Sequence, residues 1–331
     1  MRKLVSVVVV TYDSETDIAD CLDSIGRQSY TPLETLVIDN DSSDGTKDVV
    51  RSSSTPFRFI ENDSNRGFAA AHNQGIRLTR GELYLAVNPD VAMTERFIEE
   101  LVNDMEAAPT VGAVTGKLLR PAGEPGPRLI DTTGIYMTPS LRHLDRGSGE
   151  PDLGQYERAQ FVFGASGAAA LYRRRMLEDV AVDGEYFDED FFAYREDADL
   201  AWRAQLFGWR TLYVPRALAT HKRRVLPERR RNLPAVINMH SVKNRFLLRL
   251  KNQTLLELVV LFLPALVRDA QVIVYVVLFE RSSVPGLLFV ARNIRRVWSK
   301  RRQIMKRRRT PARTMLRWFS YKPISFDLGD I

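Results

Sequence analysis

Residues 4–10 read LVSVVVV, an unbroken run of mostly β-branched residues close to the start of the chain. Such a run is typical of a strand in a parallel sheet that is covered on both faces, because a strand with one wet face alternates apolar and polar residues. Further short apolar runs and helical patterns follow in alternation. Strands are predicted at 36–39, 57–60 and 83–87, and helices at 18–28, 44–51 and 67–79. This order predicts an open, doubly wound α/β sheet.

The rest of this region is less regular. Residues 120–160 contain two segments rich in Gly and Pro, which predict an irregular excursion over the sheet. An amphipathic helix is predicted at 191–207 and a last strand at 211–214. With the earlier strands, these elements predict one large α/β domain over residues 1–235.

The charge of the chain divides near residue 215. The 331 residues have a net charge of +7, but residues 1–215 carry −13 and residues 216–331 carry +20. This division argues against a uniformly basic nucleic-acid-binding protein and predicts two physical roles in one chain. Cys21 is a single cysteine, and the first apolar run is too short for a signal peptide. Both observations favour a reducing, cytoplasmic location.

Small polar residues follow the predicted strands. The strand ends read TYD at 11–13, DNDSSDG at 39–45 and NPD at 88–90. Ligands of open α/β sheets bind outside the carboxyl ends of the strands, which makes Asp39 and Asp90 candidates for a functional site. Asp, Asn and Ser also form turns and helix caps, and this alternative stays open for Ser42, Ser43 and Asp44.

Five motifs in the same order resemble the family-2 glycosyltransferases. They are SVVVVTYDS at 6–14, VIDNDSSDGT at 37–46, NRGFAAAHNQGI at 65–76, GELYLAVNPDV at 81–91 and FDEDFFAYREDADLAWR at 187–203. The similarity ends near YVPRALATH at 213–221 and covers about two-thirds of the chain. Within that family, the sequence most resembles the bacterial rhamnosyltransferase-like group, which extends lipid-linked cell-surface glycans. The resemblance implies the GT-A fold, a Rossmann-like open sheet that binds nucleotide-diphospho-sugars.

The resemblance also implies a donor site. Thr11, Tyr12 and Asp13 are expected to line the base pocket, and Asp39 is expected to hydrogen-bond the pyrimidine ring. The family usually has Asn where Asp13 stands, so the role of Asp13 is open. The other residues expected on the donor side are Asn65, Arg66, Asn73 and Asn88. Arg66 either meets a phosphate or lies exposed before a helix.

Glu196 and Asp197 match the family's pair of acids that contains the general base. By this resemblance Asp197 deprotonates the acceptor hydroxyl, and its oxygen attacks the anomeric carbon with inversion. Glu196 is expected to orient the acceptor or support the base. Asp199 stands in the same predicted helical turn and is also explained as an ordinary charged first turn.

A divalent cation is expected beside the donor diphosphate, because the leaving diphosphate gains negative charge. Asp90 matches the family's Asp-containing metal motif, and its carboxylate suits Mg²⁺ or Mn²⁺. A turn after Asn88 and Pro89 is the alternative explanation. His221 stands where the family often has a histidine, and it either completes the metal site, touches the diphosphate or is structural.

Two further segments are interpreted through the same resemblance. Gly164, Ala165 and Ser166 resemble the wall on the acceptor side, where glycine lets a substrate approach the backbone. The cations at 222–224 either help to neutralise the diphosphate or form a solvated basic run.

The last part of the chain is predicted to be helical and membrane-associating, over residues 236–331. Residues 255–279 are the most hydrophobic stretch, and residues 292–309 contain ten Lys or Arg and no acid. A core helix and a single membrane span are alternatives, but Arg268 and Asp269 in the middle fit both poorly. A helix lying in the interface of an anionic membrane, held also by the basic run, is favoured over binding of nucleic acid.

The expected activity is therefore that of an inverting, metal-dependent glycosyltransferase on the cytoplasmic face of the cell membrane, attached as a peripheral or monotopic protein. The expected partners are a nucleotide-diphospho-sugar such as dTDP-rhamnose and a polyprenyl-diphosphate-linked glycan. Two alternatives stay open. One is a catalytically degenerate, membrane-docked assembly partner, and the other is a nucleotidyltransferase, which would release pyrophosphate.

Overall fold

The computed structural model describes residues 2–123, 126–223 and 233–329. Among these residues, ten strands form one mixed sheet in the order β10-β12-β6-β11-β4-β1-β2-β3, with β5 paired to β12 and β7 paired to β6. A separate pair is formed by β8 and β9. The strands are β1 (Val5–Thr11), β2 (Leu33–Asp39), β3 (Arg58–Glu61), β4 (Leu83–Val87), β5 (Val91–Met93), β6 (Val111–Leu119), β7 (Ile130–Thr132), β8 (Ile135–Met137), β9 (His143–Asp145), β10 (Gln160–Val162), β11 (Ala169–Arg173) and β12 (Arg210–His221).

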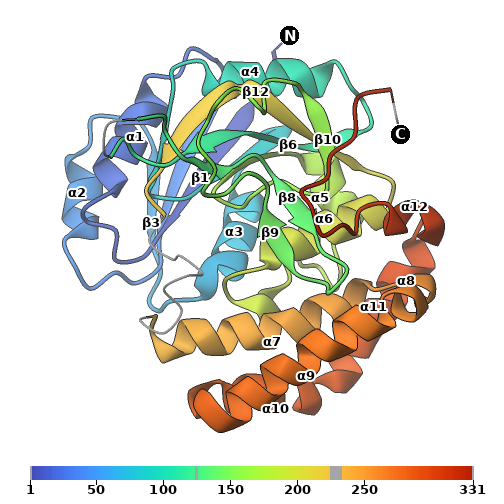
Figure 1. Ribbon diagram of the computed structural model, residues 1–331. Helices are drawn as coiled ribbons and strands as arrows, with labels where there is room; N and C mark the ends of the chain where they lie inside the picture. The colour runs from blue at the N-terminus through green and yellow to red at the C-terminus, as the bar shows by residue number, and fades with distance from the viewer. Residues whose placement is uncertain (1, 124–125, 224–232, 330–331) are drawn as a thin grey trace.

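Helices cover both faces of the sheet, as the doubly wound interpretation predicts. Figure 1 shows α4 on one side of the sheet and α3 and α6 on the other, with α7 beyond them. The helices of the α/β part are α1 (Ile18–Gly26), α2 (Thr46–Ser52), α3 (Gly67–Leu78), α4 (Phe97–Glu106), α5 (Arg174–Val180), the 3-10 turn η1 (Glu189–Phe191) and α6 (Glu196–Leu206). The later helices are α7 (Ala235–Asn252), α8 (Leu255–Val260), α9 (Phe262–Phe279), the 3-10 turn η3 (Arg281–Ser283), α10 (Val284–Arg292), α11 (Ile294–Arg307) and α12 (Ala312–Leu316).

The first four strands confirm the sequence prediction, and β4 has the predicted bounds. They pair in parallel, and the register places Thr11 of β1 opposite Asp39 of β2. The sheet as a whole is mixed, however, because β11 runs antiparallel between β4 and β6. The excursion after β6 leads into β10, which runs antiparallel to the beginning of β12. It also contains the short strands β7, β8 and β9, which the Gly- and Pro-rich sequence did not predict.

Two predicted elements have different bounds. The helix expected at 191–207 begins only at Glu196, because Phe192, Tyr194 and Arg195 have left-handed φ values of 66°, 70° and 74°. The strand expected at 211–214 is longer, since β12 runs from Arg210 to His221 alongside β6 with an irregular register. The longer strand carries His221 to the carboxyl edge of the sheet.

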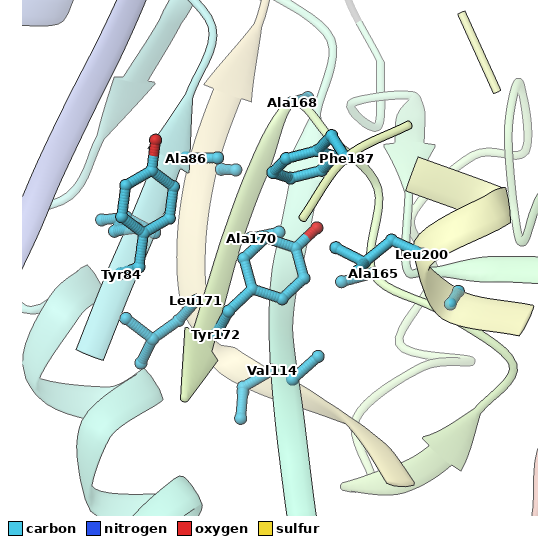
Figure 2. Close-up of a cluster of buried hydrophobic side chains, with 14 of the residues drawn as sticks. Tyr84, Ala86, Val114, Ala165, Ala168, Ala170, Leu171, Tyr172, Phe187 and Leu200 are labelled. Atoms are coloured by element: carbon cyan, nitrogen blue, oxygen red, sulfur yellow. The ribbon is translucent and has the colours of Figure 1, made fainter. Parts of the chain in front are cut away.

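The apolar core continues from the sheet to the underside of α6. Figure 2 shows Tyr172 of β11 with Phe187, Ala165 and Leu200 around it. The rings of Tyr172 and Phe187 meet edge to face with centroids 6.0 Å apart. These side chains are buried, so the start of α6 rests on the rigid part of the molecule.

The C-terminal helices pack below the sheet and do not form a detached tail. Figure 1 shows α7 running under α3 and α6, with α9, α10 and α11 farther out. The chain then returns to the sheet, where Phe326 exchanges two main-chain hydrogen bonds with Phe161 of β10. Of the described helices, α9 is long and apolar enough to cross a membrane by length and composition. Only 11% of it is buried, and Asp269 on its inner side is ion-paired with Arg245 and Arg249 of α7.

Candidate active site

The expected base-pocket residues lie together at the ends of β1 and β2. Thr11 and Asp39 are fully buried, and Tyr12 beside them is 48% exposed. The Asp39 carboxylate accepts two hydrogen bonds from Ser42, one from the main-chain N–H at 3.0 Å and one from the hydroxyl at 2.5 Å. The hydroxyl of Thr11 is buried and has no hydrogen-bond partner among the described residues. The Thr11 hydroxyl is therefore a buried polar group at these strand ends whose hydrogen-bonding capacity the described residues do not use.

Asp13 shapes the same loop from the other side. Its φ of 46° is left-handed, and its carboxylate accepts a hydrogen bond of 2.8 Å from the main-chain N–H of Ser43. Its own main-chain N–H donates to the hydroxyl of Ser42 at 3.0 Å. A short polar side chain is well suited to such a backbone conformation. Asp13 thus joins the loops that follow β1 and β2.

The donor-side residues around α3 divide into a surface group and a buried one. Arg66 is exposed, and Asn65 accepts hydrogen bonds from Gly67 at 2.9 Å and Asn40 at 3.3 Å. Asn73 is fully buried and binds the main chain of Phe187, donating at 2.8 Å and accepting at 2.9 Å. The structure therefore places Asn73 in the support of the loop that precedes α6, away from the strand-end pocket.

Asp197 stands in the first turn of α6 and faces the segment expected on the acceptor side. Its Oδ2 accepts a hydrogen bond of 3.0 Å from the main-chain N–H of Gly167. The neighbouring Ala168 accepts one of 2.8 Å from the main-chain N–H of Asn88. Asp197 is half-buried. Burial and the nearby Asp145 raise the pKa of Asp197, although the Gly167 N–H opposes the shift.

The small residues expected on the acceptor side allow their segment to pack closely against α6. Gly164 lies so close to α6 that a β-carbon there would stand 2.4 Å from the β-carbon of Ala201. Ala165 and Ser166, which follow it, are 2% and 5% exposed. Together they form a narrow wall of small side chains beside Asp197.

The two acids next to Asp197 differ from it. Glu196 is 6% exposed, and its Oε2 has no hydrogen-bond partner among the described residues. Burial, followed by the charge of Asp197, raises the pKa of Glu196 well above its usual value. Asp199 is fully buried and accepts hydrogen bonds from Arg203 at 3.0 Å, Lys251 at 2.9 Å and Asn252 at 2.7 Å. Asp199 therefore has a structural role, because its carboxylate is enclosed by these three partners.

Asp90 and His221 meet at the carboxyl edge of the sheet. His221 Nε2 lies 3.3 Å from Asp90 Oδ1, and His221 Nδ1 lies 2.7 Å from Asp131 Oδ2. Burial lowers the pKa of His221, but its hydrogen bonds to Asp131 and Asp90 outweigh burial and raise the pKa to about 9. The sequence prediction missed Asp131, which lies in β7 within the supposedly irregular excursion.

This pair fits part of a metal site. Among the residues that the structure describes, no group of three or more His, Cys, Asp or Glu side chains is arranged to hold a metal ion. Asp90 Oδ1 is nevertheless buried with no hydrogen bond of regular geometry, and an imidazole nitrogen faces it. One carboxylate oxygen and one imidazole nitrogen suit a cation such as Mn²⁺, whose other ligands come from a diphosphate and water.

The basic residues after β12 connect these groups. Arg223 binds Asp145 and lies 3.2 Å from Asp131, and its charge also acts on Asp197. Lys222 pairs instead with Asp17 at 3.0 Å and Asp20 at 3.1 Å. Arg224 lies outside the described residues. The sequence prediction did not include Asp131 and Asp145, because no apolar run predicts the short strands β7 and β9 in which they lie.

The chain is similar in sequence to known bacterial proteins. The poly-beta-1,6-N-acetyl-D-glucosamine synthase of Staphylococcus epidermidis is 27% identical over 220 residues, which are 65% of this chain and 48% of the relative. The Staphylococcus aureus synthase is 25% identical over the same shares. The chain therefore spans about half the length of the curated relatives it matches.

Solved structures share the fold. A mannosyltransferase from Pyrobaculum calidifontis, in complex with GDP-Man and Mn²⁺, has a TM-score of 0.52 and 20% identity over 96% of this chain and 79% of its own. S. aureus TarS in complex with UDP-GlcNAc has a TM-score of 0.53 and 18% identity over 76% of this chain and 67% of its own. These likenesses show the GT-A fold. The profile described as "Glycosyl transferase family 2" matches residues 6–181, more than half of the chain, and the protein belongs to this family.

Proposed function

We propose that this chain is an inverting glycosyltransferase in which Asp197 is the general base. The observation that carries the proposal is the half-buried Asp197 carboxylate, which the Gly167 N–H holds beside the small-residue wall. Asp197 takes the proton of an acceptor hydroxyl as the oxygen forms a bond to the anomeric carbon. The bond from that carbon to the diphosphate oxygen breaks, and the nucleoside diphosphate leaves. Glu196 supports the base from its buried position.

The donor would lie along the ends of β1, β2 and β4. Thr11 has a free buried hydroxyl to offer the base, and Tyr12 is exposed enough to stack on it. Asp39 and Asp13 hold the loop that bounds the pocket, and each oxygen of Asp39 can accept a further hydrogen bond from the pyrimidine. Asn65, Arg66 and Asn88 border the path toward the sugar, whereas Asn73 acts through the loop at Phe187.

Asp90 and His221 would hold the divalent cation, Mg²⁺ or Mn²⁺. When bound, the cation would offset the negative charge of the departing diphosphate. Asp131 keeps His221 Nε2 directed at Asp90 through its bond to Nδ1. The fold neighbour with GDP-Man and Mn²⁺ supports use of a cation by this kind of site.

The identities of donor and acceptor are finer proposals. The motifs of residues 65–76 and 187–203 favour the rhamnosyltransferase-like group, with dTDP-rhamnose as donor and a polyprenyl-diphosphate-linked glycan as acceptor. The synthases among the relatives and the TarS complex favour UDP-GlcNAc as the competing donor. In both cases the product belongs to a cell-surface polysaccharide.

The C-terminal region, 236–331, is proposed to dock on the cytoplasmic face of an anionic membrane, with residues 1–235 as the catalytic domain. Apolar side chains on α8 and α9 support docking because they are largely exposed, as at Val259, Leu263 and Phe279. Arg295 and Arg302 border an open hollow with the 46% exposed Trp298. Cations near an anionic leaflet contribute about 1 kcal/mol each, and Trp favours the interface.

A donor panel tests the proposed function. The purified chain is incubated with dTDP-rhamnose, UDP-GlcNAc or GDP-mannose, with Mn²⁺ or EDTA, and with a polyprenyl-diphosphate-linked GlcNAc acceptor. We expect release of nucleoside diphosphate from one donor, dependent on the cation. Release of pyrophosphate would instead identify a nucleotidyltransferase. Binding of nucleotide without any transfer would favour the degenerate assembly partner.

A further inference from the structure

The loop that leads into α6 is held in an unusual conformation. Phe192, Tyr194 and Arg195 have left-handed φ values, which side chains other than glycine rarely adopt. These residues directly precede Glu196 and Asp197. The orientation of Asp197 at the start of α6 therefore depends on the contacts that hold these three residues in their backbone conformation.

One side of the loop contacts α3. The main-chain carbonyl of Phe192 accepts a hydrogen bond of 3.1 Å from Ala69, and Gly67 beside it has a φ of 79°. A β-carbon at Gly67 would stand 2.5 Å from that same carbonyl oxygen. Asn73 binds Phe187 and Glu189 at the beginning of the loop.

The other side of the loop contacts α7, in the C-terminal region. The two N–H groups of the Asn244 side chain are shared among three main-chain carbonyls, at N···O distances of 2.9 Å to Phe191, 2.8 Å to Ala193 and 2.7 Å to Tyr194. Asn244 is fully buried. Three converging acceptors require a donor, so the amide is fixed in this orientation and neither a carboxylate nor an apolar side chain can replace it.

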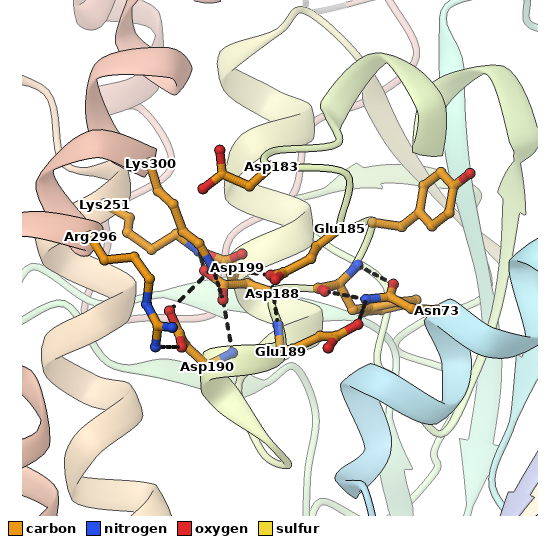
Figure 3. A network of polar contacts seen from close by, with 12 residues as sticks. Asn73, Asp183, Glu185, Asp188, Glu189, Asp190, Asp199, Lys251, Arg296 and Lys300 are labelled. Carbon is orange, nitrogen blue, oxygen red and sulfur yellow. Dashed lines mark hydrogen bonds and ion pairs between the residues drawn. The ribbon is translucent and has the colours of Figure 1, made fainter. Parts of the chain in front are cut away.

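More side chains on the same face of α7 extend this contact. His240 stacks on Phe192 with ring centroids 4.7 Å apart at 10°, and Ser241 lies 3.4 Å from Arg195. Positions 240, 241 and 251 lie four, three and seven residues from position 244, the spacings that bring side chains to one helical face. Lys251 at the far end binds Asp188, at the start of the loop, and Asp199 of α6. Lys300 of α11 also binds Asp188, at 2.7 Å (Figure 3).

We propose that α7 is part of the catalytic apparatus, with Asn244 as a positioning residue that holds the carbonyls of Phe191, Ala193 and Tyr194 and thereby orients Asp197. This inference rests on the proposed role of Asp197 as the base. It gives the C-terminal region a task in catalysis that is independent of membrane docking. Loss of Asn244 then lowers kcat, because Asp197 no longer meets the acceptor hydroxyl, while the nucleotide pocket at β1 and β2 is unchanged.

The test compares Asn244→Ala with Asn293→Ala in the full chain. Asn293 donates to the carbonyl of Phe289 at 2.9 Å, inside the C-terminal helices and away from the loop that leads into α6. Each variant loses a side-chain amide that binds a carbonyl in this region. We measure kcat and donor KM with the most active donor and acceptor of the panel, the Kd of the matching nucleoside diphosphate, and the melting temperature.

We expect Asn244→Ala to lower kcat about tenfold or more, with donor KM and nucleotide Kd within about twofold of the parent. Asn293→Ala keeps the parent kcat even where its melting temperature falls. An equal, small fall of kcat in both variants would show a merely structural role and overturn the proposal. If Asn244→Ala does not fold, His240→Ala replaces it, because His240 is only half-buried, and the same lowered kcat with unchanged Kd is expected.

Asp197→Asn separates this inference from the proposed function. If Asp197→Asn keeps the parent kcat, the assignment of the base is wrong whatever Asn244 does. If Asp197→Asn is inactive but Asn244→Ala and His240→Ala both keep the parent kcat, only the role of α7 is wrong.

Discussion

Lys251 of α7 lies 2.9 Å from the carboxylate of Asp199 in α6, and both side chains are buried. Residues 1–215 carry a net charge of −13 and residues 216–331 carry +20, and such ion pairs neutralise part of this charge inside the molecule. Figure 3 shows the same relationship for Lys300 and Arg296, which reach Asp188 and Asp190. The basic C-terminal region is therefore bound to the acidic α/β part, in addition to its proposed contact with a membrane.

The first prediction concerns this buried pair. Lys251→Met leaves Asp188 and Asp199 with one cation fewer in a dry environment, and we expect the free energy of unfolding to fall by about 3–5 kcal/mol. Denaturant unfolding at pH 7 measures the change. Lys306→Met, at an exposed position on α11, serves as the control and is expected to stay within about 0.5 kcal/mol. Equal stability of the two variants would show that the ion pairs of Lys251 with Asp188 and Asp199 do not stabilise the packing of α7 against α6.

Local signals explain how much of the fold could be predicted. The strands β1 and β4 and the helix α3 follow from apolar runs and periodicity that span at most a few residues, and short motifs are what make Asp90 and Asp197 candidates for the site. The reversed β11 and the strand β7 that carries Asp131 depend on pairing with distant segments, which no local pattern encodes. The start of α6 was placed too early because the apolar periodicity continues through Phe192 and Tyr194, where tertiary contacts impose left-handed backbone.

The C-terminal third was predicted only in part for the same reason. Its apolar and basic runs indicated a membrane surface, and α9 does expose an apolar face. No local pattern indicated that Lys300, Arg296 and Asn244 turn inward, since their partners are at least 50 residues away along the chain.

Asp131 provides the second prediction. Asp131→Asn weakens the bond that orients His221, and we expect the Mn²⁺ affinity in the presence of nucleoside diphosphate to fall roughly 10- to 100-fold. Calorimetry with Mn²⁺ measures this, and nucleotide affinity in EDTA is expected to be unchanged. Asp152→Asn is the control, because Asp152 lies in the same excursion but pairs with Lys117. Unaltered Mn²⁺ affinity in Asp131→Asn would remove His221 from the proposed cation site.

Glu257 provides a prediction about pH. Its carboxyl is fully buried in the capping box of α8, and burial raises its pKa from 4.5 to about 7. The folded state thus holds this proton more tightly, so the stabilisation is complete below about pH 4 and is lost as pH rises through 7. Glu257→Gln keeps the capping box but cannot ionise. Between pH 5 and pH 8 we expect the parent to lose roughly 3 kcal/mol relative to this variant, measured by denaturant unfolding. Parallel pH profiles of the two proteins would contradict the account.

The exposed face of α9 provides a prediction about membranes. Leu263 is 67% exposed, so Leu263→Asp leaves the fold intact but puts a charge on the proposed lipid-facing side. Removal of one Leu from the interface costs about 1.5–3 kcal/mol, and we expect at least tenfold weaker binding to phosphatidylglycerol vesicles in sedimentation. Leu153→Asp, at a 76% exposed position in the excursion, should bind as the parent does. Equal binding of both variants would exclude α9 from the membrane contact.

The role of Asp197 as general base is tested most directly by the kinetics of Asp197→Asn with the donor and acceptor that the parent uses. The account predicts a fall of kcat by about 100-fold or more, with the nucleoside diphosphate Kd unchanged. Since Asp197 must be ionised to act and burial raises its pKa, the parent rate should fall on the acid side with a midpoint above that of a free aspartate. Near-parental kcat in Asp197→Asn, with the same acid limb, would contradict the account.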